Sequence, residues 1–286
     1  MRFRLAFSTN AYTRHRLKFA VEDIAAAGYE GVEILADVPH AWPPDFDGDD
    51  ADKLAKRLDK LGLAVSNVNA NCSFGYWTDA PPEPYFEPSL CSPNKRHRRD
   101  RIKLIKKTLD LATRIGARNI SITTGRALPG APPEVADANL REGLAEVLDH
   151  AAKREVAVGI ESEPGLWIER YDELRHLIDT IGSPLLGANL DIGHSWVGHE
   201  DLEAAITTLG KAIFNLHVED IPDRKHYHLV PGDGNLDWDA VKRGLEKIGY
   251  DRFLTVELYT MTAEPERAAR RSREFLEKTF NAAPVE

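Results

Sequence analysis

One pattern repeats along the chain. An amphipathic helical stretch ends at a glycine, and a short apolar run follows, as at Gly28 before residues 31–35 and Gly62 before residues 64–68. A glycine just past a helix adopts the left-handed turn at little cost. The runs are too short for helices and mostly apolar, which is typical of strands buried on both faces. The same motif returns at Gly116, Gly182, Gly210 and Gly249.

The pattern predicts eight strands that alternate with eight helices. The strands are expected at residues 3–8, 31–35, 64–68, 119–122, 156–160, 185–190, 213–216 and 253–256. The helices are expected at about residues 17–27, 50–61, 99–115, 134–153, 171–181, 200–210, 237–248 and 265–281. Such alternation predicts parallel strands with right-handed crossovers, and eight units fit a closed barrel. We therefore expect an α/β fold, a single (β/α)8 TIM-barrel domain over residues 1–286. The alternative is an open doubly wound sheet, which the lack of a glycine-rich loop after the first strand disfavours.

Composition and charge narrow the function. The chain has 46 Asp and Glu against 37 Lys and Arg, a formal net charge of −9, and this makes nucleic acid an unfavoured partner. Two cysteines in 286 residues fit a reducing compartment rather than a disulfide scaffold. No membrane span or signal-peptide core is predicted, so we expect a cytoplasmic protein with no membrane partner.

A long loop over residues 69–98 is predicted after the third strand, where a barrel builds its sites. We interpret it as a packed lid because it carries the aromatic residues Phe74, Tyr76, Trp77, Tyr85 and Phe86. Cys72 and Cys91 in this loop are interpreted as packing residues. The basic run at 95–101 is interpreted as a solvated helix start, with a phosphorylated or carboxylated substrate as the alternative reason for it.

The strongest functional signal lies at the ends of four consecutive strands. Glu161, Asp191, His217 and Glu257 each follow a predicted apolar run directly. In a parallel barrel these ends meet at one mouth, and buried acids and imidazoles rarely lack partners. Buried carboxylates placed together would repel one another, and a cation bound between them would remove that repulsion. Three carboxylates and one imidazole suit Mn²⁺ best, with Mg²⁺, Co²⁺ or Zn²⁺ as alternatives.

The same strand ends carry a family resemblance. Ile-Glu-x-Glu-Pro, Leu-Asp-x-Gly-His, Leu-His-Val-x-Asp and Val-Glu-Leu resemble the xylose-isomerase-like TIM-barrel superfamily, over nearly the whole chain. That superfamily holds sugar phosphate isomerases and epimerases, ketose 3-epimerases, dehydratases and apurinic-site endonucleases. Resemblance to the ketose 3-epimerases implies that Glu161, Asp191, His217 and Glu257 bind one divalent metal. It also implies that Glu161 and Glu257 are the catalytic acid/base pair.

These roles are chemically coherent. A metal that chelates a carbonyl and the adjacent hydroxyl oxygen acidifies the C–H between them. One carboxylate removes that proton to give an enediolate, and the other returns a proton to the opposite face or to the neighbouring carbon. The expected activity is isomerisation or epimerisation of a small sugar, sugar phosphate or keto-polyol. We expect a small, polar, carbohydrate-like substrate.

Further residues are predicted to contact this substrate from strand ends or from the loop after strand seven. They are His194, Arg224, His226, His228, Glu163, Glu33, Asn10, Asn69 and Trp42. In the superfamily a histidine at the place of His194 contacts substrate or a second metal. His226 and His228 resemble the Asp-x-His pair that binds a further zinc in the endonucleases, so a second, weaker metal on these three histidines is an alternative role.

Other functions stay open. A lyase on the same scaffold, such as an inosose or dehydroshikimate dehydratase or a C-glycoside-cleaving enzyme, begins with the same proton abstraction. A non-catalytic metabolite-binding protein is a second alternative. The endonuclease alternative is disfavoured because strands three and four end without the histidines of its three-zinc cluster. A homo-oligomer is expected from the resemblance.

Overall fold

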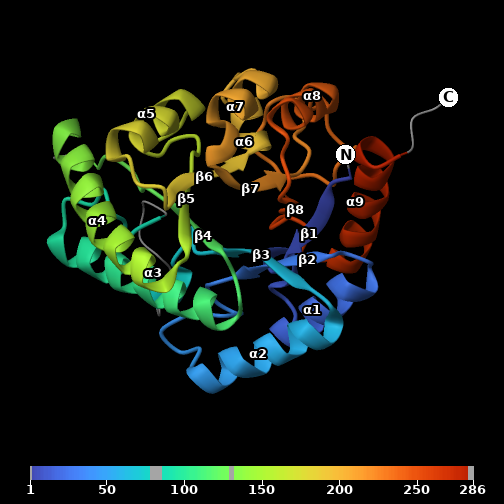
Figure 1. Cartoon of the computed structure of the whole chain (residues 1–286), viewed down its shortest axis with the longest axis horizontal. Coiled ribbons are helices and arrows are strands. Elements are labelled where there is room, and N and C mark those ends of the chain that lie inside the picture. The colour runs from blue at the N-terminus through green and yellow to red at the C-terminus, as the bar shows by residue number, and fades with distance from the viewer. Residues whose placement is uncertain (1, 78–85, 129–131, 283–286) are drawn as a thin grey trace.

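The computed structural model describes residues 2–77, 86–128 and 132–282. Eight parallel strands close into a barrel in chain order (Figure 1). They are β1 Arg4–Ser8, β2 Gly31–Leu35, β3 Ala64–Asn69, β4 Asn119–Thr123, β5 Ala157–Glu161, β6 Leu186–Asp191, β7 Ile213–Val218 and β8 Phe253–Val256. Strand β1 pairs with β8 as well as with β2. The closure confirms the predicted (β/α)8 barrel and excludes the open sheet.

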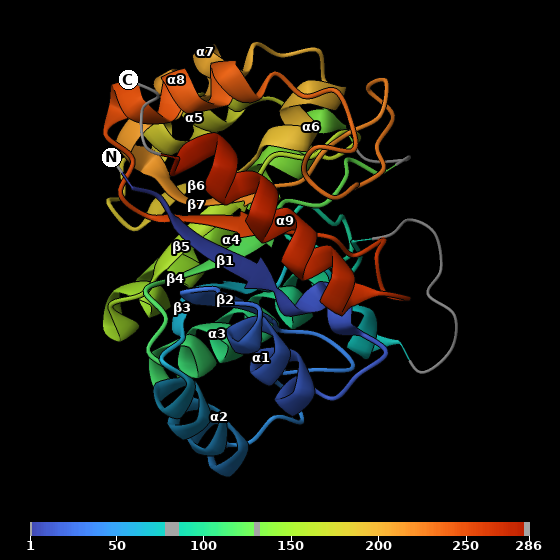
Figure 2. The same cartoon turned by 90° about the vertical axis from the view of Figure 1, so that its right-hand side faces the viewer.

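Helices surround the barrel in Figure 1. They are α1 Leu17–Ala26, α2 Gly48–Leu61, α3 Lys95–Arg114, α4 Pro133–Arg154, α5 Tyr171–Ile181, α6 Ile192–Val197, α7 Leu202–Leu209, α8 Trp238–Ile248 and α9 Pro265–Phe280. As predicted, Gly62 and Gly182 end their helices with left-handed backbones, at φ 68° and 66°. Figure 2 shows α9 lying across β1. There Asn281 accepts from the Phe3 backbone N–H and donates to the Phe3 carbonyl, at 2.7 and 2.9 Å.

One helix starts about one turn earlier than predicted and another was not predicted, and both begin at a capping side chain. Helix α3 begins at Lys95 rather than near residue 99, because the Asn94 side chain accepts from the Arg96 backbone N–H at 2.9 Å. Helix α6 was not predicted. Asp191 caps it by accepting from the His194 N–H at 2.8 Å, so the turn after β6 becomes helical.

The barrel interior below the mouth is polar, which the sequence pattern did not predict. Asn67 donates to Ser121 at 2.9 Å, and Asn119 donates to Asn67 at 2.8 Å. On the other side of the interior Thr255 donates to Asn215 at 2.9 Å. A buried polar group left unpaired costs about 1–3 kcal/mol, so these side chains are tolerated because they bond one another. The apolar residues that alternate with them pack in the hydrophobic core.

The loop after β3 is organised by a buried arginine. The side chain of Arg101 in α3 donates to the carbonyls of Ala70, Asn71 and Cys72 at 2.7, 3.1 and 3.2 Å. Arg101 is 1% exposed. The basic run at 95–101 was predicted to be exposed to solvent at the start of a helix. Lys95 is exposed as predicted, whereas Arg101 is buried.

The aromatic residues of this loop are only partly packed. Trp77 donates through Nε1 to the Glu87 carbonyl at 3.0 Å, whereas Phe74 and Tyr76 are 43% and 36% exposed. Tyr85 lies outside the described residues. Cys91 is buried in the hydrophobic core, as predicted, but Cys72 lines the pocket at the barrel mouth.

Candidate metal centre

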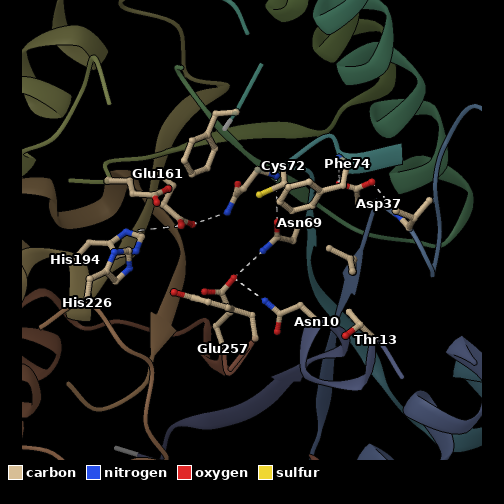
Figure 3. A pocket seen from close by; sticks show the side chains of 16 residues that line it. Asn10, Thr13, Asp37, Asn69, Cys72, Phe74, Glu161, His194, His226 and Glu257 are labelled. Atoms are coloured by element: carbon tan, nitrogen blue, oxygen red, sulfur yellow. Dashed lines mark hydrogen bonds and ion pairs between the residues drawn. The ribbon is translucent and has the colours of Figure 1, made fainter. Parts of the chain in front are cut away.

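A cavity of about 460 Å³ opens at the carboxyl ends of the strands, a volume typical of small-molecule sites. Figure 3 shows Glu161 and His194 on one side of this pocket. Asp37 and Phe74 lie on the opposite side, and Glu257 lies between the two. Asp37 accepts from the backbone N–H groups of Phe74 and Gly75 at 2.6 and 2.8 Å. Its carboxylate thus fixes the opposite wall.

The four predicted ligands meet beside this pocket. Glu161, Asp191, His217 and Glu257 each offer a ligand atom, and these atoms all lie within 4.8 Å of one another. Each side chain comes from the end of one of the consecutive strands β5 to β8 or from the residue after it. All four are buried, at 6% exposure or less. Such a convergence of buried acids and an imidazole is what a divalent cation stabilises.

His217 is oriented for metal binding by a carboxylate behind it. Its Nε2 lies 2.7 Å from Glu33 Oε2, so Nε2 carries the proton and donates it. Its Nδ1 faces the carboxylates, at 3.2 Å from Glu161 and 3.8 Å from both Asp191 and Glu257. Burial lowers the pKa of His217, but Glu33, Glu257 and Glu161 raise it well above the ordinary value. Histidines that bind a metal through one ring nitrogen commonly donate the other ring N–H to a carboxylate, as His217 does to Glu33.

Glu33 therefore has a different position from the one predicted. We expected it to bind substrate hydroxyls, but it has no exposed surface and lies beneath His217. Asn67, Asn69 and Asn215 also donate to its carboxylate. Its place within β2, two residues before the strand ends, explains the burial, because only the last residues of a strand reach the mouth.

The two glutamates of the cluster are held by amide side chains. Asn71 donates to Glu161 at 2.9 Å, and Asn10 and Asn69 donate to Glu257 at 2.9 and 3.0 Å. Burial raises the pKa of Glu257 to about 8, although His217 opposes the shift. A bound cation would reverse this shift, because it favours the charged carboxylate.

The two carboxylate oxygens of Asp191 have different surroundings. Oδ1 accepts from the His194 backbone N–H, whereas no N–H donor among the described residues reaches the buried Oδ2. Burial raises the pKa of Asp191, but His194, His228 and His217 outweigh it and lower the pKa below its usual range. A buried carboxylate oxygen beside three other ligand atoms fits a divalent-cation site. The four residues therefore have the donor types, burial and orientation that a divalent metal requires.

The predicted substrate contacts divide into two groups. His194, His226, Glu163, Asn10 and Asn69 line the pocket, as expected for residues that meet substrate. Burial raises the pKa of Glu163 to about 7. His194 is fixed by its Nδ1, which lies 3.1 Å from the Ser162 carbonyl.

Three further predicted contacts lie elsewhere. Arg224 stacks over the Trp196 ring at 3.7 Å and donates to its carbonyl. Trp42 packs against Tyr76, with 6.1 Å between the ring centroids. His228 is fully buried behind the pocket, with Nδ1 3.0 Å from the Glu257 carbonyl. None of these three side chains lines the described pocket, so their contact with substrate stays a prediction.

Several site residues were not predicted. Asn71 and Asn189 both contact Glu161, and Glu219 lies beside Asp191 and His228. Asn189 and Glu219 each stand two positions from a predicted ligand, Asp191 or His217. In a strand that spacing places two side chains on the same face, so the signal was present in the sequence.

The ends of β3 and β4 agree with the analysis of the sequence. They supply Asn69, Asn71 and Thr123 rather than histidines. Thr123 donates to the Asn71 carbonyl at 2.9 Å. Among the described residues no helix is long and apolar enough to span a membrane.

The comparisons with known proteins identify the family. Residues 21–279 match the Xylose isomerase-like TIM barrel family, and the chain belongs to it. The chain is 25% identical to fructoselysine 3-epimerase of Escherichia coli O157:H7 over 272 residues, 93% of this chain and 94% of that protein.

Two solved structures show the same fold. A D-tagatose 3-epimerase-like protein superposes with a TM-score of 0.81 at 21% identity, covering 98% of this chain and 97% of that one. The IOLI protein with a bound zinc atom superposes with a TM-score of 0.77 at 19% identity, covering 98% of each chain.

Proposed function

We propose that the chain is a divalent-metal-dependent isomerase or epimerase of a small sugar, sugar phosphate or keto-polyol. The observation that carries this proposal is the convergence of Glu161, Asp191, His217 and Glu257 beside a pocket of small-molecule size. The similarity to fructoselysine 3-epimerase supports a ketose-type substrate. We propose Mn²⁺ as the ion because oxygen ligands outnumber nitrogen three to one in the cluster.

The ion, when bound to these four residues, would polarise a substrate carbonyl and stabilise the negative charge that develops on it. Glu161 and Glu257 act as the acid/base pair. They come from β5 and from the residue after β8, so they reach the reacting carbon from different directions. One carboxylate takes the proton next to the carbonyl, and the other delivers a proton to the opposite face.

The amide side chains around the pair set its geometry. Asn71 holds Glu161, and Asn10 and Asn69 hold Glu257, through the hydrogen bonds given above. One oxygen of each carboxylate is therefore fixed by amide hydrogen bonds, and both glutamates line the pocket. His194 and Glu163 line the same side and are proposed to bind substrate hydroxyls.

Apolar side chains line part of the pocket, among them Leu35, Val38 and Phe86. Phe74 and Asp37 form the wall opposite Glu161. A substrate that presents its carbonyl to Glu257 and Glu161 would place its far end against these side chains. Displacing water from this wall strengthens the electrostatic contacts in the pocket.

The proposal is tested by proton exchange in heavy water. The purified protein with Mn²⁺ is incubated with ketoses and keto-polyols, and NMR follows loss of the C–H signal beside the carbonyl and appearance of an isomer. Exchange that stops on chelation supports the proposal. A product lighter by one water, or a new conjugated absorbance, identifies a dehydratase instead. Binding without exchange on any substrate identifies a binding protein, and cleavage of an abasic oligonucleotide identifies the endonuclease.

Glu257→Gln gives the matched variant. The amide keeps the size of the side chain but cannot accept the substrate proton, so turnover and exchange are expected to vanish while circular dichroism stays unchanged. Glu264→Gln, at an exposed carboxylate that pairs with Arg267, serves as the control and should retain full turnover. Retained activity in Glu257→Gln contradicts the assigned role.

A further inference from the structure

Glu219 is a buried acid that the proposed reaction does not use. It follows β7 directly and has no exposed surface, and no N–H donor among the described residues reaches either carboxylate oxygen. The Asp191 carboxylate lies within hydrogen-bond reach, but two carboxylates can bond each other only if they share a proton. A Cβ at Gly193 would lie 2.0 Å from Glu219 Oε1, so the absence of a side chain at Gly193 makes room for this carboxylate. A buried carboxylate without a partner is costly.

His228 presents a free lone pair to the same place. Its Nδ1 lies 3.0 Å from the Glu257 backbone carbonyl, so Nδ1 carries the proton. Its Nε2 is therefore the unprotonated nitrogen, and Nε2 is buried without a partner among the residues described. A neutral imidazole with one nitrogen fixed by a carbonyl is the usual form of a histidine that binds a metal.

Asp191 completes the group. Its Oδ2 is also buried with no N–H donor in reach among the described residues, and ligand atoms of Asp191, Glu219 and His228 all lie within 4.8 Å of one another. None of the three side chains has exposed surface. Side chains from β6, from the residue after β7 and from the following loop thus bring three buried ligand atoms within 4.8 Å of one another.

We infer that Asp191, Glu219 and His228 form a second divalent-cation site, with Asp191 bridging it to the first. The inference goes beyond the proposed function, which needs one ion only. The charges favour it, because five carboxylates here are at most 6% exposed: Glu33, Glu161, Asp191, Glu219 and Glu257. Two divalent ions would balance four of these five carboxylates when all five are ionised.

A second arrangement uses the same histidine. His194, His226 and His228 also lie within 4.8 Å of one another. His226 is exposed, and the three histidines alone bring no carboxylate to the ion. A divalent ion gains more from two carboxylates than from two further imidazoles, so His228 is assigned to the site with Glu219.

Metal stoichiometry tests the inference. The chelator-treated full chain is titrated with Mn²⁺ by calorimetry, and bound metal is counted by mass spectrometry. Wild type is expected to take two ions per chain. Glu219→Gln should take one, and His228→Gln, which removes a different ligand, should also take one. In the electron paramagnetic resonance spectrum, the doubly loaded wild type should show coupled ions and Glu219→Gln an isolated one.

Three control variants separate this inference from its rivals. Glu257→Gln should lose the first ion and keep the second, so failure of the second site is distinguishable from failure of the proposed function. His226→Gln should keep both ions, and loss of one there would assign the second ion to the three histidines. Glu200→Gln, at a buried carboxylate that accepts from the Tyr171 N–H, should keep both.

A wild type that takes only one ion at millimolar Mn²⁺ overturns the inference. The pair Asp191 and Glu219 would then share a proton instead. Two ions in Glu219→Gln overturn it as well, and so does loss of both, since Glu219 would then support the first site rather than form a second.

Discussion

Substitution of Glu33 by glutamine isolates the contribution of the carboxylate behind His217. Glu33 Oε2 accepts from His217 Nε2 at 2.7 Å, and both side chains are fully buried. Loss of such an outer partner lowers metal affinity by about 10- to 100-fold, or about 1.4 to 2.8 kcal/mol. We therefore expect the Kd for Mn²⁺ to rise by about that factor in Glu33→Gln.

The neighbours of Glu33 explain why glutamine cannot replace it. If the amide oxygen keeps the bond to His217, the NH2 group takes the place of Oε1, 3.2 Å from the Asn69 donor. Asn69 cannot turn its oxygen toward that group at no cost, because Oδ1 already accepts from the Asn71 N–H at 3.1 Å. Two donors would face each other in a buried site, at a cost of about 1–3 kcal/mol.

Calorimetric titration with Mn²⁺ measures the effect. Glu30→Gln is the control, because Glu30 pairs with Arg2 on the surface and its loss should leave the Kd unchanged. Urea unfolding of the metal-free proteins measures the loss of folding stability caused by the two facing amide donors. That loss is thereby separated from the loss of metal affinity. A Kd within about twofold of wild type would refute the reasoning, since the carboxylate would then have no role in orienting His217.

Three other substitutions probe the surroundings of the site. Arg101→Met removes the donor to the carbonyls of Ala70, Asn71 and Cys72 and should cost about 3 kcal/mol in urea unfolding; a loss below about 0.5 kcal/mol would contradict the assigned role. Gly193→Ala crowds Glu219 and should destabilise by about 1–3 kcal/mol through overpacking, measured by the same method, and an unchanged unfolding midpoint would show that Glu219 has room to move. Burial lowers the pKa of His40 below its ordinary value of 6.5, so stability from this group is complete above pH 6.5 and falls as the pH drops below it. His40→Gln should therefore lose less Tm than wild type between pH 7.5 and pH 5, and equal losses would contradict this account.

The four proposed ligands were predictable because their positions depend on one rule. A residue that directly follows a buried parallel strand lies at the barrel mouth, whatever the details of packing. Glu161, Asp191, His217 and Glu257 lie within one residue of the ends of their strands, and the structure brings them together. The closed barrel was predictable for a related reason, since alternation of apolar runs and helices survives small errors in their boundaries.

How far below the barrel mouth a given side chain lies was harder to predict. Glu33 and Asn67 lie on interior-facing positions below the mouth, and their roles depend on which residues of neighbouring strands stand level with them. Register between strands is not visible in a single sequence. The polar network inside the barrel was therefore missed, and Glu33 was assigned to substrate.

Loop residues were the least predictable. Arg224 turns onto Trp196, and His228 folds inward behind Glu257, whereas His226 reaches the pocket. Loops have no hydrophobic period that separates inward from outward positions. Even alternating histidines two residues apart gave no indication of which would be buried.

The most direct test of the central claim is an anomalous difference map from a crystal soaked in Mn²⁺. We predict a peak bounded by Glu161, Asp191, Glu257 and His217, with His217 coordinating through Nδ1 while Nε2 stays on Glu33. The absence of a peak among these four side chains, or coordination of His217 through Nε2, would contradict the account.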